Sequence, residues 1–328
     1  MSFLHFLENL RTSFLDAIFL VITMLGEETF FLVIALVFVW CVNKREGFYI
    51  LISGLMGTLI NQTLKLICRV PRPWVKDPSF KPVGNAIEEA TGYSFPSGHT
   101  QNATTTFGAI ALFHRKRLGA VITLAAAIIL VGFSRMYLGV HTPADVLTSL
   151  GIGFALIFLL HPLFETEEKF QRSMPYIVIG AVLASLAFLI FVLLTPEQSH
   201  DTHNYHSALK NACTLFGCTV ALIPMYLLDS KYIKFDTKAS WYVQLIKLVA
   251  GFGLVLAVKS GLSSPLTALF GNEYVARAVR YFLVVIMAGV VWPYCFRYLV
   301  KIKIPALDRF GARVHGIFKS EKRGDKVI

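Results

Sequence analysis

Long runs of apolar residues, each about as long as a lipid bilayer is thick, recur along the whole chain. A helix needs about 20 mostly apolar residues to cross the hydrocarbon core. Only 16% of the 328 residues are charged and 55% are hydrophobic, which excludes a disordered chain and almost any soluble enzyme. The runs show no alternating strand pattern, and backbone polar groups must be satisfied inside lipid. The sequence therefore predicts an all-α, polytopic helical membrane protein.

The apolar runs predict about ten transmembrane helices, six in an N-terminal core and four in a C-terminal bundle. The opening stretch, residues 3–42, is too long for one helix and is interrupted by Gly26, Glu27 and Glu28. We expect two helices there, the first of which could begin as an interfacial amphipathic helix. The predicted spans are 4–25, 29–42, 47–67, 99–113, 119–138, 143–163, 175–195, 209–228, 243–262 and 276–299.

The chain is expected to divide at a charged connector, residues 164–174, after which Pro175 restarts an apolar run. This division predicts a six-helix membrane domain at residues 1–163. It also predicts a four-helix membrane bundle of unknown role at residues 175–299 and a basic tail at 300–328.

The positive net charge of +11 has a different meaning here from the one it has in a soluble protein. In a membrane protein an excess of lysine and arginine marks the cytoplasmic loops, so we expect no nucleic-acid partner. Basic residues gather in alternate connectors, such as Lys44–Arg45 and Arg115–Arg117, and in the tail. We therefore expect a cytoplasmic C-terminus, an outward-facing connector at 70–98, and a location in the plasma membrane or the bacterial inner membrane.

Three polar segments stand where predicted spans end on the outer side. In the first, Lys65 and Arg72 are about two helical turns apart, and Pro71 and Pro73 force Arg72 out of helical geometry. An interfacial side chain that reaches toward the headgroups would explain either cation taken alone.

The second segment precedes the span at 99–113. Ser97 can cap that helix, Gly98 lets a ligand approach the backbone closely, and His99 lies in the first turn. Free amides at a helix start bind phosphate well, although capping alone would explain a lone Ser-Gly-His sequence.

The third segment joins two spans and contains Ser134, Arg135, His141 and Asp145. His141 and Asp145 are four residues apart, which places them within reach across one helical turn. A carboxylate that holds one imidazole nitrogen leaves the other available as a nucleophile or base, and a structural role is the alternative.

All three segments are expected at the same outer face, so their charges would converge. Three cations (Lys65, Arg72 and Arg135), two imidazoles and helix-start amides, with no metal-ligand cluster, describe a phosphoryl-binding site. Placing three such cations near a bilayer would cost free energy unless an anionic ligand bound them.

The order K-x6-R-P, P-S-G-H and S-R-x5-H-x3-D resembles the type 2 phosphatidic acid phosphatase superfamily, which includes the lipid phosphate phosphatases. The resemblance covers about residues 1–163, and longer members such as glucose-6-phosphatases also carry extra helices. The signature positions present are Lys65, Arg72, Pro73, Pro96, Ser97, Gly98, His99, Ser134, Arg135, His141 and Asp145.

The resemblance implies a role for each matched residue. His141 would attack phosphorus and form a phosphohistidine, Asp145 would orient it, and His99 would protonate the leaving oxygen and then activate water. The residues implied in phosphate binding are Lys65, Arg72, Ser97, Gly98 and Arg135, and neither a metal nor a cofactor is implied.

The function expected from these roles is a metal-independent membrane phosphatase with an extracytoplasmic site, acting on a lipid phosphate or a polyprenyl diphosphate. The expected partners are an amphiphilic phosphorylated lipid and membrane lipids, and a homodimer stays open. The alternatives are a lipid-linked phosphotransferase that uses the same site, or a lipid transporter or flippase.

Two groups outside the motifs also bear on function. His200, His203 and His206 follow one another at a spacing of three, which could bind zinc or could belong to a solvated loop. The other group consists of basic residues near membrane depth in the second bundle, which either act in function or reach toward the interface. Its members are Lys210, Lys259, Arg277 and Arg280.

Overall fold

The computed structural model describes residues 1–88, 90–197 and 201–309, and all regular secondary structure in these residues is helical. Seven of the described helices are long and apolar enough to cross a membrane, or eight if one bent pair counts as a single span. The all-α membrane architecture is therefore confirmed, whereas the number of about ten spans remains a prediction. Residues 310–328, most of the predicted tail, lie outside the described residues.

The described residues of the first half of the chain form nine α-helices, and α4 contacts α3, α7 and α9 among them. Two of them, α2 and α3, form the bent pair, with an angle of 47° between them. The elements are α1 (Ser2–Asn9), α2 (Ser13–Met24), α3 (Glu28–Val37), η1 (Phe38–Val42), α4 (Lys44–Cys68), α5 (Pro73–Lys76), α6 (Gly84–Glu88), α7 (Gly98–Phe113), α8 (Leu118–Tyr137), α9 (Pro143–Leu160) and η2 (His161–Phe164).

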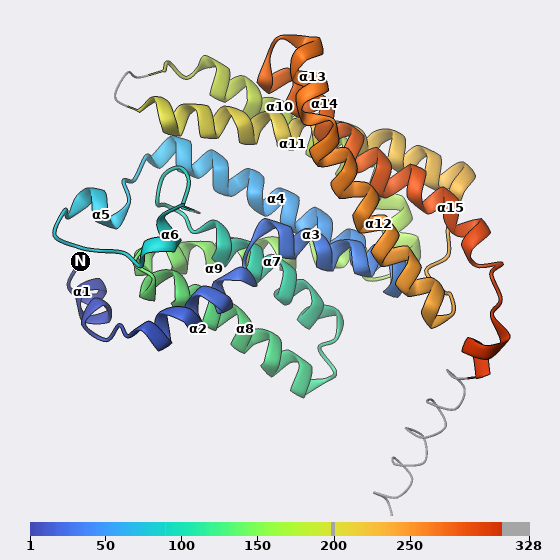
Figure 1. Cartoon of the computed structure of the whole chain (residues 1–328), viewed down its shortest axis with the longest axis horizontal. Helices are drawn as coiled ribbons and strands as arrows, with labels where there is room; N and C mark the ends of the chain where they lie inside the picture. Colours follow the sequence, from blue (N-terminus) through green and yellow to red (C-terminus); the bar gives the residue numbers. More distant parts are fainter. Residues whose placement is uncertain (89, 198–200, 310–328) are drawn as a thin grey trace, which may run out of the picture.

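The second half forms a second group of helices beside α4. Figure 1 shows α3 and α4 between the α7–α9 group on one side and α10 and α11 on the other. The elements are α10 (Glu167–Leu194), α11 (Thr202–Leu228), η3 (Asp229–Ile233), α12 (Trp241–Gly261), α13 (Ser263–Phe270), α14 (Glu273–Ile286), η4 (Met287–Val291) and α15 (Trp292–Leu299).

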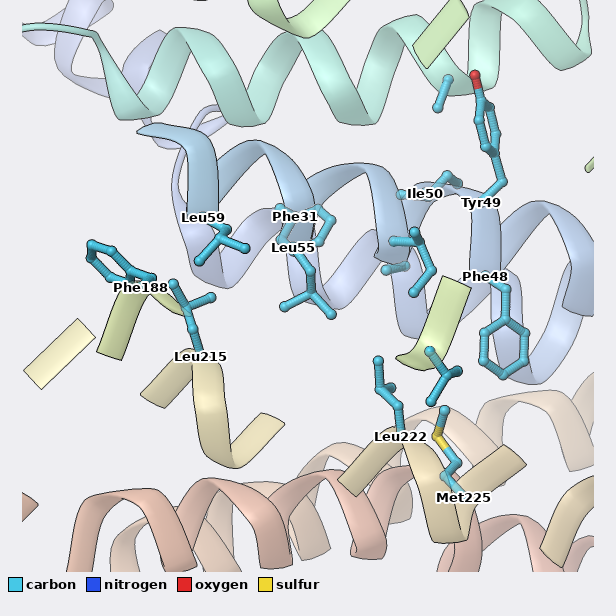
Figure 2. Packing of buried hydrophobic residues seen from close by; sticks show 14 of the residues in the cluster. Phe31, Phe48, Tyr49, Ile50, Leu55, Leu59, Phe188, Leu215, Leu222 and Met225 are labelled. Atoms are coloured by element: carbon cyan, nitrogen blue, oxygen red, sulfur yellow. The ribbon is translucent and has the colours of Figure 1, made fainter. Parts of the chain in front are cut away.

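Helix α4 joins the two groups because it is buried on most of its circumference. Its side chains, Leu55 and Leu59 among them, pack in one hydrophobic cluster with Phe31 of α3, Phe188 of α10 and Leu215 of α11 (Figure 2). A helix that is buried on most of its circumference is expected in the middle of a bundle rather than at its lipid-facing surface. The two groups of helices therefore share a core.

A second contact joins the two groups of helices near the C-terminal end of α3. Trp40 is fully buried in η1 and donates from its indole nitrogen to the Ala288 carbonyl at 2.9 Å. Trp292 donates to the Lys247 carbonyl at 2.9 Å, within the same aromatic cluster. Buried indole groups usually find a hydrogen-bond partner, and here the partners come from the second half of the chain.

The structure differs from the predicted boundaries in three places. The expected helix 4–25 is broken into α1 and α2, because Thr12 accepts a hydrogen bond from the Leu15 amide and caps a new helix. The expected connector at 164–174 is mostly helical, since Thr166 caps α10 and the helix continues through Pro175. The connector between the predicted spans 243–262 and 276–299 contains the short helix α13.

One end of the bundle, called the site end below, is where α4 and α8 finish and α7 and α9 begin. There His5 of α1 bonds to Asp77 after α5 and to Glu8, each at 2.9 Å. These bonds raise the pKa of His5, and bonds from Ser79 and His5 lower the pKa of Asp77 to about 2. The contact is therefore strongest when His5 is protonated and Asp77 is ionised.

This contact predicts a pH-dependent attachment of α1. The contribution of His5 is fully present below its unfolded pKa of about 6.5 and is lost as the pH rises through the raised folded value. We expect amide exchange in α1 to become faster between pH 6 and pH 8, after correction for intrinsic exchange. His5→Ala should remove that difference, and equal protection of wild-type α1 at both pH values would contradict the expectation.

Candidate active site

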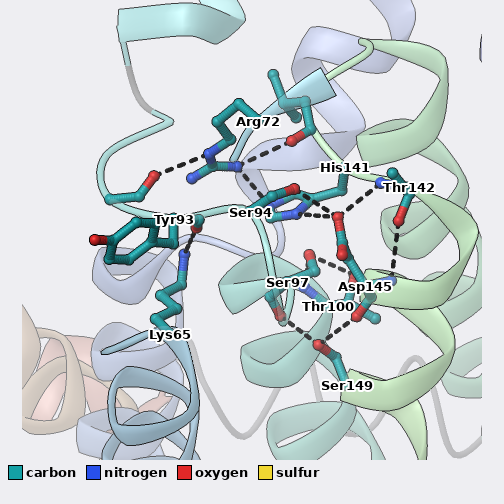
Figure 3. Close-up of polar contacts among 12 residues, drawn as sticks. Lys65, Arg72, Tyr93, Ser94, Ser97, Thr100, His141, Thr142, Asp145 and Ser149 are labelled. Atoms are coloured by element: carbon teal, nitrogen blue, oxygen red, sulfur yellow. Dashed lines mark hydrogen bonds and ion pairs between the residues drawn. The ribbon is translucent and has the colours of Figure 1, made fainter. Parts of the chain in front are cut away.

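The site end encloses a cavity of about 180 Å³, in which the three motif segments meet. Six of the eight predicted site residues line it, and Ser97 and Asp145 are not among its lining residues. Figure 3 shows Asp145 beside His141 and Ser97 near Thr100 and Ser149. The six are Lys65, Arg72, Gly98, His99, Arg135 and His141. Segments far apart in the sequence are thus brought together at one point, as the converging span ends predict.

Two of the cations hydrogen-bond to the loop that covers the cavity, residues 91–93. Lys65 is only 7% exposed and donates to the Tyr93 carbonyl at 2.6 Å. Arg72 donates to the Gly92 carbonyl at 3.1 Å and to the Thr91 carbonyl at 2.8 Å. Both side chains are therefore desolvated and held in place by neutral acceptors, in positions where phosphate oxygens would be stronger acceptors.

The capping box of α9 aligns His141 with Asp145. Oδ2 of Asp145 accepts from the Thr142 amide at 2.8 Å and from Oγ of Ser94 at 2.6 Å. The same oxygen lies 3.4 Å from Nδ1 of His141, longer than a normal hydrogen bond. On the other side of the ring, Nε2 lies 3.1 Å from a guanidinium nitrogen of Arg72. This arrangement favours the tautomer with the proton on Nδ1 and the lone pair on Nε2.

The surroundings of His141 favour its uncharged form. Burial is the main reason that the pKa of His141 lies well below its ordinary value, and Arg72 lowers it further, although Asp145 opposes the shift. A neutral imidazole has a free lone pair, so it can act as a nucleophile at physiological pH.

His99 and Arg135 also line the cavity. Nε2 of His99 is buried and makes no hydrogen bond to any described residue. Arg135 is 1% exposed, and it donates to Oγ1 of Thr23 in α2 at 2.6 Å. Gly26, at the bend after α2, lies so close that a Cβ atom there would be 2.7 Å from the His99 carbonyl oxygen. The α2–α3 bend therefore supports both residues.

The Ser97–Gly98 step starts α7, as predicted. Oγ of Ser97 accepts from the Thr100 amide at 3.4 Å, and the Ser97 amide donates to the Asp145 carbonyl at 3.2 Å. A Cβ atom on Gly98 would meet nothing nearer than Oδ1 of Asn61, 3.9 Å away. Gly98 therefore leaves the first turn of α7 open toward the cavity.

The sequence reasoning did not identify several polar residues that line the same cavity. Thr58, Asn61 and Gln62 precede Lys65 on α4 at spacings of seven, four and three residues, which places them on one helical face. The recurrence of polar residues on one face of an apolar span is the sequence signal that could have identified them. The others are Glu28 of α3 and Gln101 and Asn102 of α7.

The predicted histidine group lies only partly within the described residues. His200 lies outside them, and no group of three possible metal ligands occurs elsewhere in the described chain. His203 and His206 lie in the first turns of α11 rather than in a loop. His206 contacts the Tyr274 hydroxyl at 2.6 Å and Glu197 at 3.4 Å, so it joins α11 to α14.

A loop contact links the second half of the chain to the residues around the cavity. The hydroxyl of Tyr93, whose carbonyl accepts from Lys65, donates to Oδ2 of Asp201 before α11. Asp201 also accepts from the Asn204 amide group at 2.6 Å. The loop over the cavity is therefore attached to both halves of the protein.

Comparison with known proteins agrees with this geometry. The PAP2 superfamily profile matches residues 46–169, and the profile described as "PAP2 superfamily phosphatase, transmembrane extension" matches residues 209–303. Phosphatidylglycerophosphatase B of Bacillus subtilis (strain 168) is 32% identical over 177 residues, which are 50% of this chain and 82% of that protein. The same bacterium's undecaprenyl-diphosphatase BcrC is 32% identical over 151 residues, 45% of this chain and 75% of that protein.

More distant relatives act on other lipid phosphates. Sphingosine-1-phosphate phosphatase 1 of Rattus norvegicus is 27% identical over 185 residues, 54% of this chain and 42% of that protein. No solved structure matches the chain. The two Bacillus relatives are similar over most of their own length, and the matched core contains all three motif segments. The chain therefore belongs to the PAP2 superfamily and is a membrane phosphatase that carries the superfamily's transmembrane extension.

Proposed function

We propose that the protein removes phosphate from a lipid phosphate or a polyprenyl diphosphate, through a phosphohistidine on His141 and without a metal ion. The observation that carries this proposal is the cavity in which His141 lies between Arg72 and Asp145. Phosphoryl transfer depends mainly on positioning and on stabilisation of charge, and three fixed cations supply that charge here.

In the first step, Nε2 of His141 attacks phosphorus, and the bond between phosphorus and the leaving oxygen breaks. Lys65, Arg72, Arg135 and the start of α7 at Ser97 and Gly98 hold the phosphoryl oxygens. His99, in its protonated form, gives its proton to the leaving oxygen. Asp145 stabilises the positive charge that develops on the His141 ring.

In the second step, His99 takes a proton from water, and the resulting nucleophile attacks phosphorus. The N–P bond breaks, and the electron pair returns to Nε2 of His141. Inorganic phosphate leaves, and both histidines are restored. His99 suits both roles because it lines the cavity and its Nε2 has no hydrogen-bond partner among the described residues.

The active site is proposed to face the extracytoplasmic side, in the plasma membrane or the bacterial inner membrane. The connectors at the opposite end of the bundle contain more lysine and arginine, such as Lys44, Arg45 and Arg115–Arg117. By the same reasoning, the C-terminus is cytoplasmic. Residues 1–163 would form the phosphatase domain and residues 175–299 a separate bundle.

The substrate is proposed to be amphiphilic, because a site at the end of a membrane bundle lets the apolar tail remain in lipid. Two 32% identical relatives are named for phosphatidylglycerophosphate and undecaprenyl diphosphate, which are the first substrates to test.

The test is phosphate release by the purified full-length protein in the presence of EDTA, with a panel of lipid monophosphates and polyprenyl diphosphates. We expect undiminished turnover in EDTA, and the order of kcat/KM values then identifies the substrate class. Loss of activity in EDTA with recovery on metal addition would contradict the mechanism. Transfer of label to an added lipid or sugar instead of water would indicate a phosphotransferase.

A further inference from the structure

A buried amide without a hydrogen-bond partner lies in the wall of the catalytic cavity. Asn61 of α4 is 1% exposed, and it lines the cavity one helical turn before Lys65. Neither Nδ2 nor Oδ1 of Asn61 hydrogen-bonds to any residue that the structure describes. Most buried polar groups in proteins are paired, and an unpaired amide inside a membrane bundle destabilises the fold. Asn61 therefore points to a role other than holding the fold together.

The position of Asn61 relative to Gly98 indicates what its amide could meet. Gly98 is the first residue of α7 and lines the same cavity. The space that a Cβ atom on Gly98 would take is bordered by Oδ1 of Asn61, at 3.9 Å. Amides at a helix start attract phosphate oxygens. The Asn61 side chain thus faces the open first turn of α7, where a phosphoryl group would bind.

A second unpaired amide in the cavity occupies a different place. Gln101 of α7 is also 1% exposed, and neither atom of its amide has a hydrogen-bond partner in the described part of the chain. Its Nε2 would be 3.0 Å from a Cβ on Gly57 of α4 and 3.2 Å from one on Gly153 of α9. Gly57 precedes Asn61 by one helical turn, so the Gln101 amide lies deeper in the bundle. The two residues therefore allow a comparison within one cavity.

The charges around the cavity favour a phosphoryl oxygen as the ligand of Asn61. Three cations line the cavity, whereas Glu28 is the one carboxylate among the lining residues that the structure describes. The cations are Lys65, Arg72 and Arg135. Nδ2 of asparagine carries two N–H groups, and a hydrogen bond from such a group to an anionic oxygen is stronger than one between neutral groups. A neutral donor adds direction to the attraction of the cations without adding charge.

We propose that Asn61 is a further phosphate-binding residue, whose Nδ2 donates to a phosphoryl oxygen held over the first turn of α7. The proposal rests on the proposed phosphatase function, with His141 as the nucleophile. A half-turn about χ2 puts Nδ2 in the place of Oδ1, and no hydrogen bond to a described residue opposes that turn. The oxygen concerned stays on phosphorus through both chemical steps. The bond therefore strengthens the binding of substrate and of free phosphate alike.

The test measures lipid phosphate hydrolysis by the purified full-length protein and the inhibition of that hydrolysis by inorganic phosphate. For Asn61→Leu we expect kcat/KM to fall and the Ki of phosphate to rise, each about tenfold. Because this change removes a buried unpaired amide, the melting temperature should be no lower than that of wild type. A residue with a merely structural role would lose stability together with activity.

Thr63→Val is the matched control on the same helix. The Thr63 hydroxyl donates to the Leu59 carbonyl at 2.8 Å, and the residue lines an apolar groove between α4 and α10 instead of the catalytic cavity. Its Ki for phosphate should stay within about twofold of wild type. Gln101→Met removes the deeper amide and should raise the Ki less than Asn61→Leu does.

Asn61→Asp tests the contact with a side chain of nearly the same shape if Asn61→Leu does not fold. Its carboxylate would repel the phosphoryl oxygens, so the Ki should rise by at least about tenfold. An unchanged Ki in both Asn61 variants would overturn the proposed contact. Equal increases in Asn61→Leu and Gln101→Met would also overturn it and assign the loss to the polarity of the cavity. Absence of hydrolysis by the wild-type protein would instead contradict the proposed function.

Discussion

Replacement of His141 by alanine is expected to reduce phosphate release by at least about 10⁴-fold, the scale of loss seen when a nucleophile is removed. The reason is geometric: Nε2 of His141 is the ring nitrogen beside Arg72, and Asp145 lies on the other side of the same ring. His99, the other imidazole that lines the cavity, makes no ion pair among the described residues. The measurement is kcat for the purified variant, together with trapping of a phosphorylated protein.

The matched control is His203→Ala, which removes an exposed imidazole from the start of α11. It should retain wild-type turnover and show that loss of a histidine does not itself inactivate the protein. Near-wild-type phosphate release by His141→Ala, in a variant that folds and inserts, would exclude His141 as the nucleophile. An acid-labile phosphoryl label that persists in that variant would lead to the same conclusion.

The change Asp145→Asn is expected to lower kcat by about 10³- to 10⁴-fold, because an amide no longer stabilises the charge on His141 or fixes its tautomer. Oδ2 of Asp145 meets three groups: Ser94, Thr142 and His141. The amide oxygen of asparagine can occupy the place of Oδ2, but it does not carry the negative charge. KM should change much less than kcat, and steady-state kinetics would separate the two.

Thr142→Ala serves as the control for the helix cap. It removes the hydroxyl that accepts from the Asp145 amide at 3.4 Å but leaves the Asp145 carboxylate in place. Such a cap contributes about 1 kcal/mol of stability, so the variant should unfold more readily with kcat within a few-fold of wild type. If Asp145→Asn lost only as much activity as Thr142→Ala, Asp145 would be a helix cap without a role in catalysis.

The sequence allowed much of this site to be predicted because its charged residues stand where apolar spans end. Lys65, Arg72, His99, Arg135 and His141 all line one cavity, which follows from the common side of their helix ends. Their roles remain predictions that the two substitutions above test. The apolar runs likewise predicted helices, whereas caps such as Thr12 and Thr166, which set the boundaries, were not recognised.

Other parts of the site have weak sequence signals. Thr23 bonds to Arg135 across 112 residues of chain, and nothing in a single sequence reports such a distant partner. The acceptors of Lys65 and Arg72 are backbone carbonyls of residues 91–93, and any residue type carries a carbonyl. In the sequence, Glu28 stands out only as an interruption of an apolar span. Its place on the cavity wall depends on the bend between α2 and α3.

The carbonyls that hold Lys65 and Arg72 have a consequence for the end of the catalytic cycle. Both cations have already left bulk water in the folded protein, so a phosphate group that binds exchanges one set of acceptors for a more strongly attracting one. That exchange does not depend on whether the phosphate is still esterified. Free phosphate meets the same donors, and we therefore expect the enzyme to be slowed by its own product as phosphate accumulates.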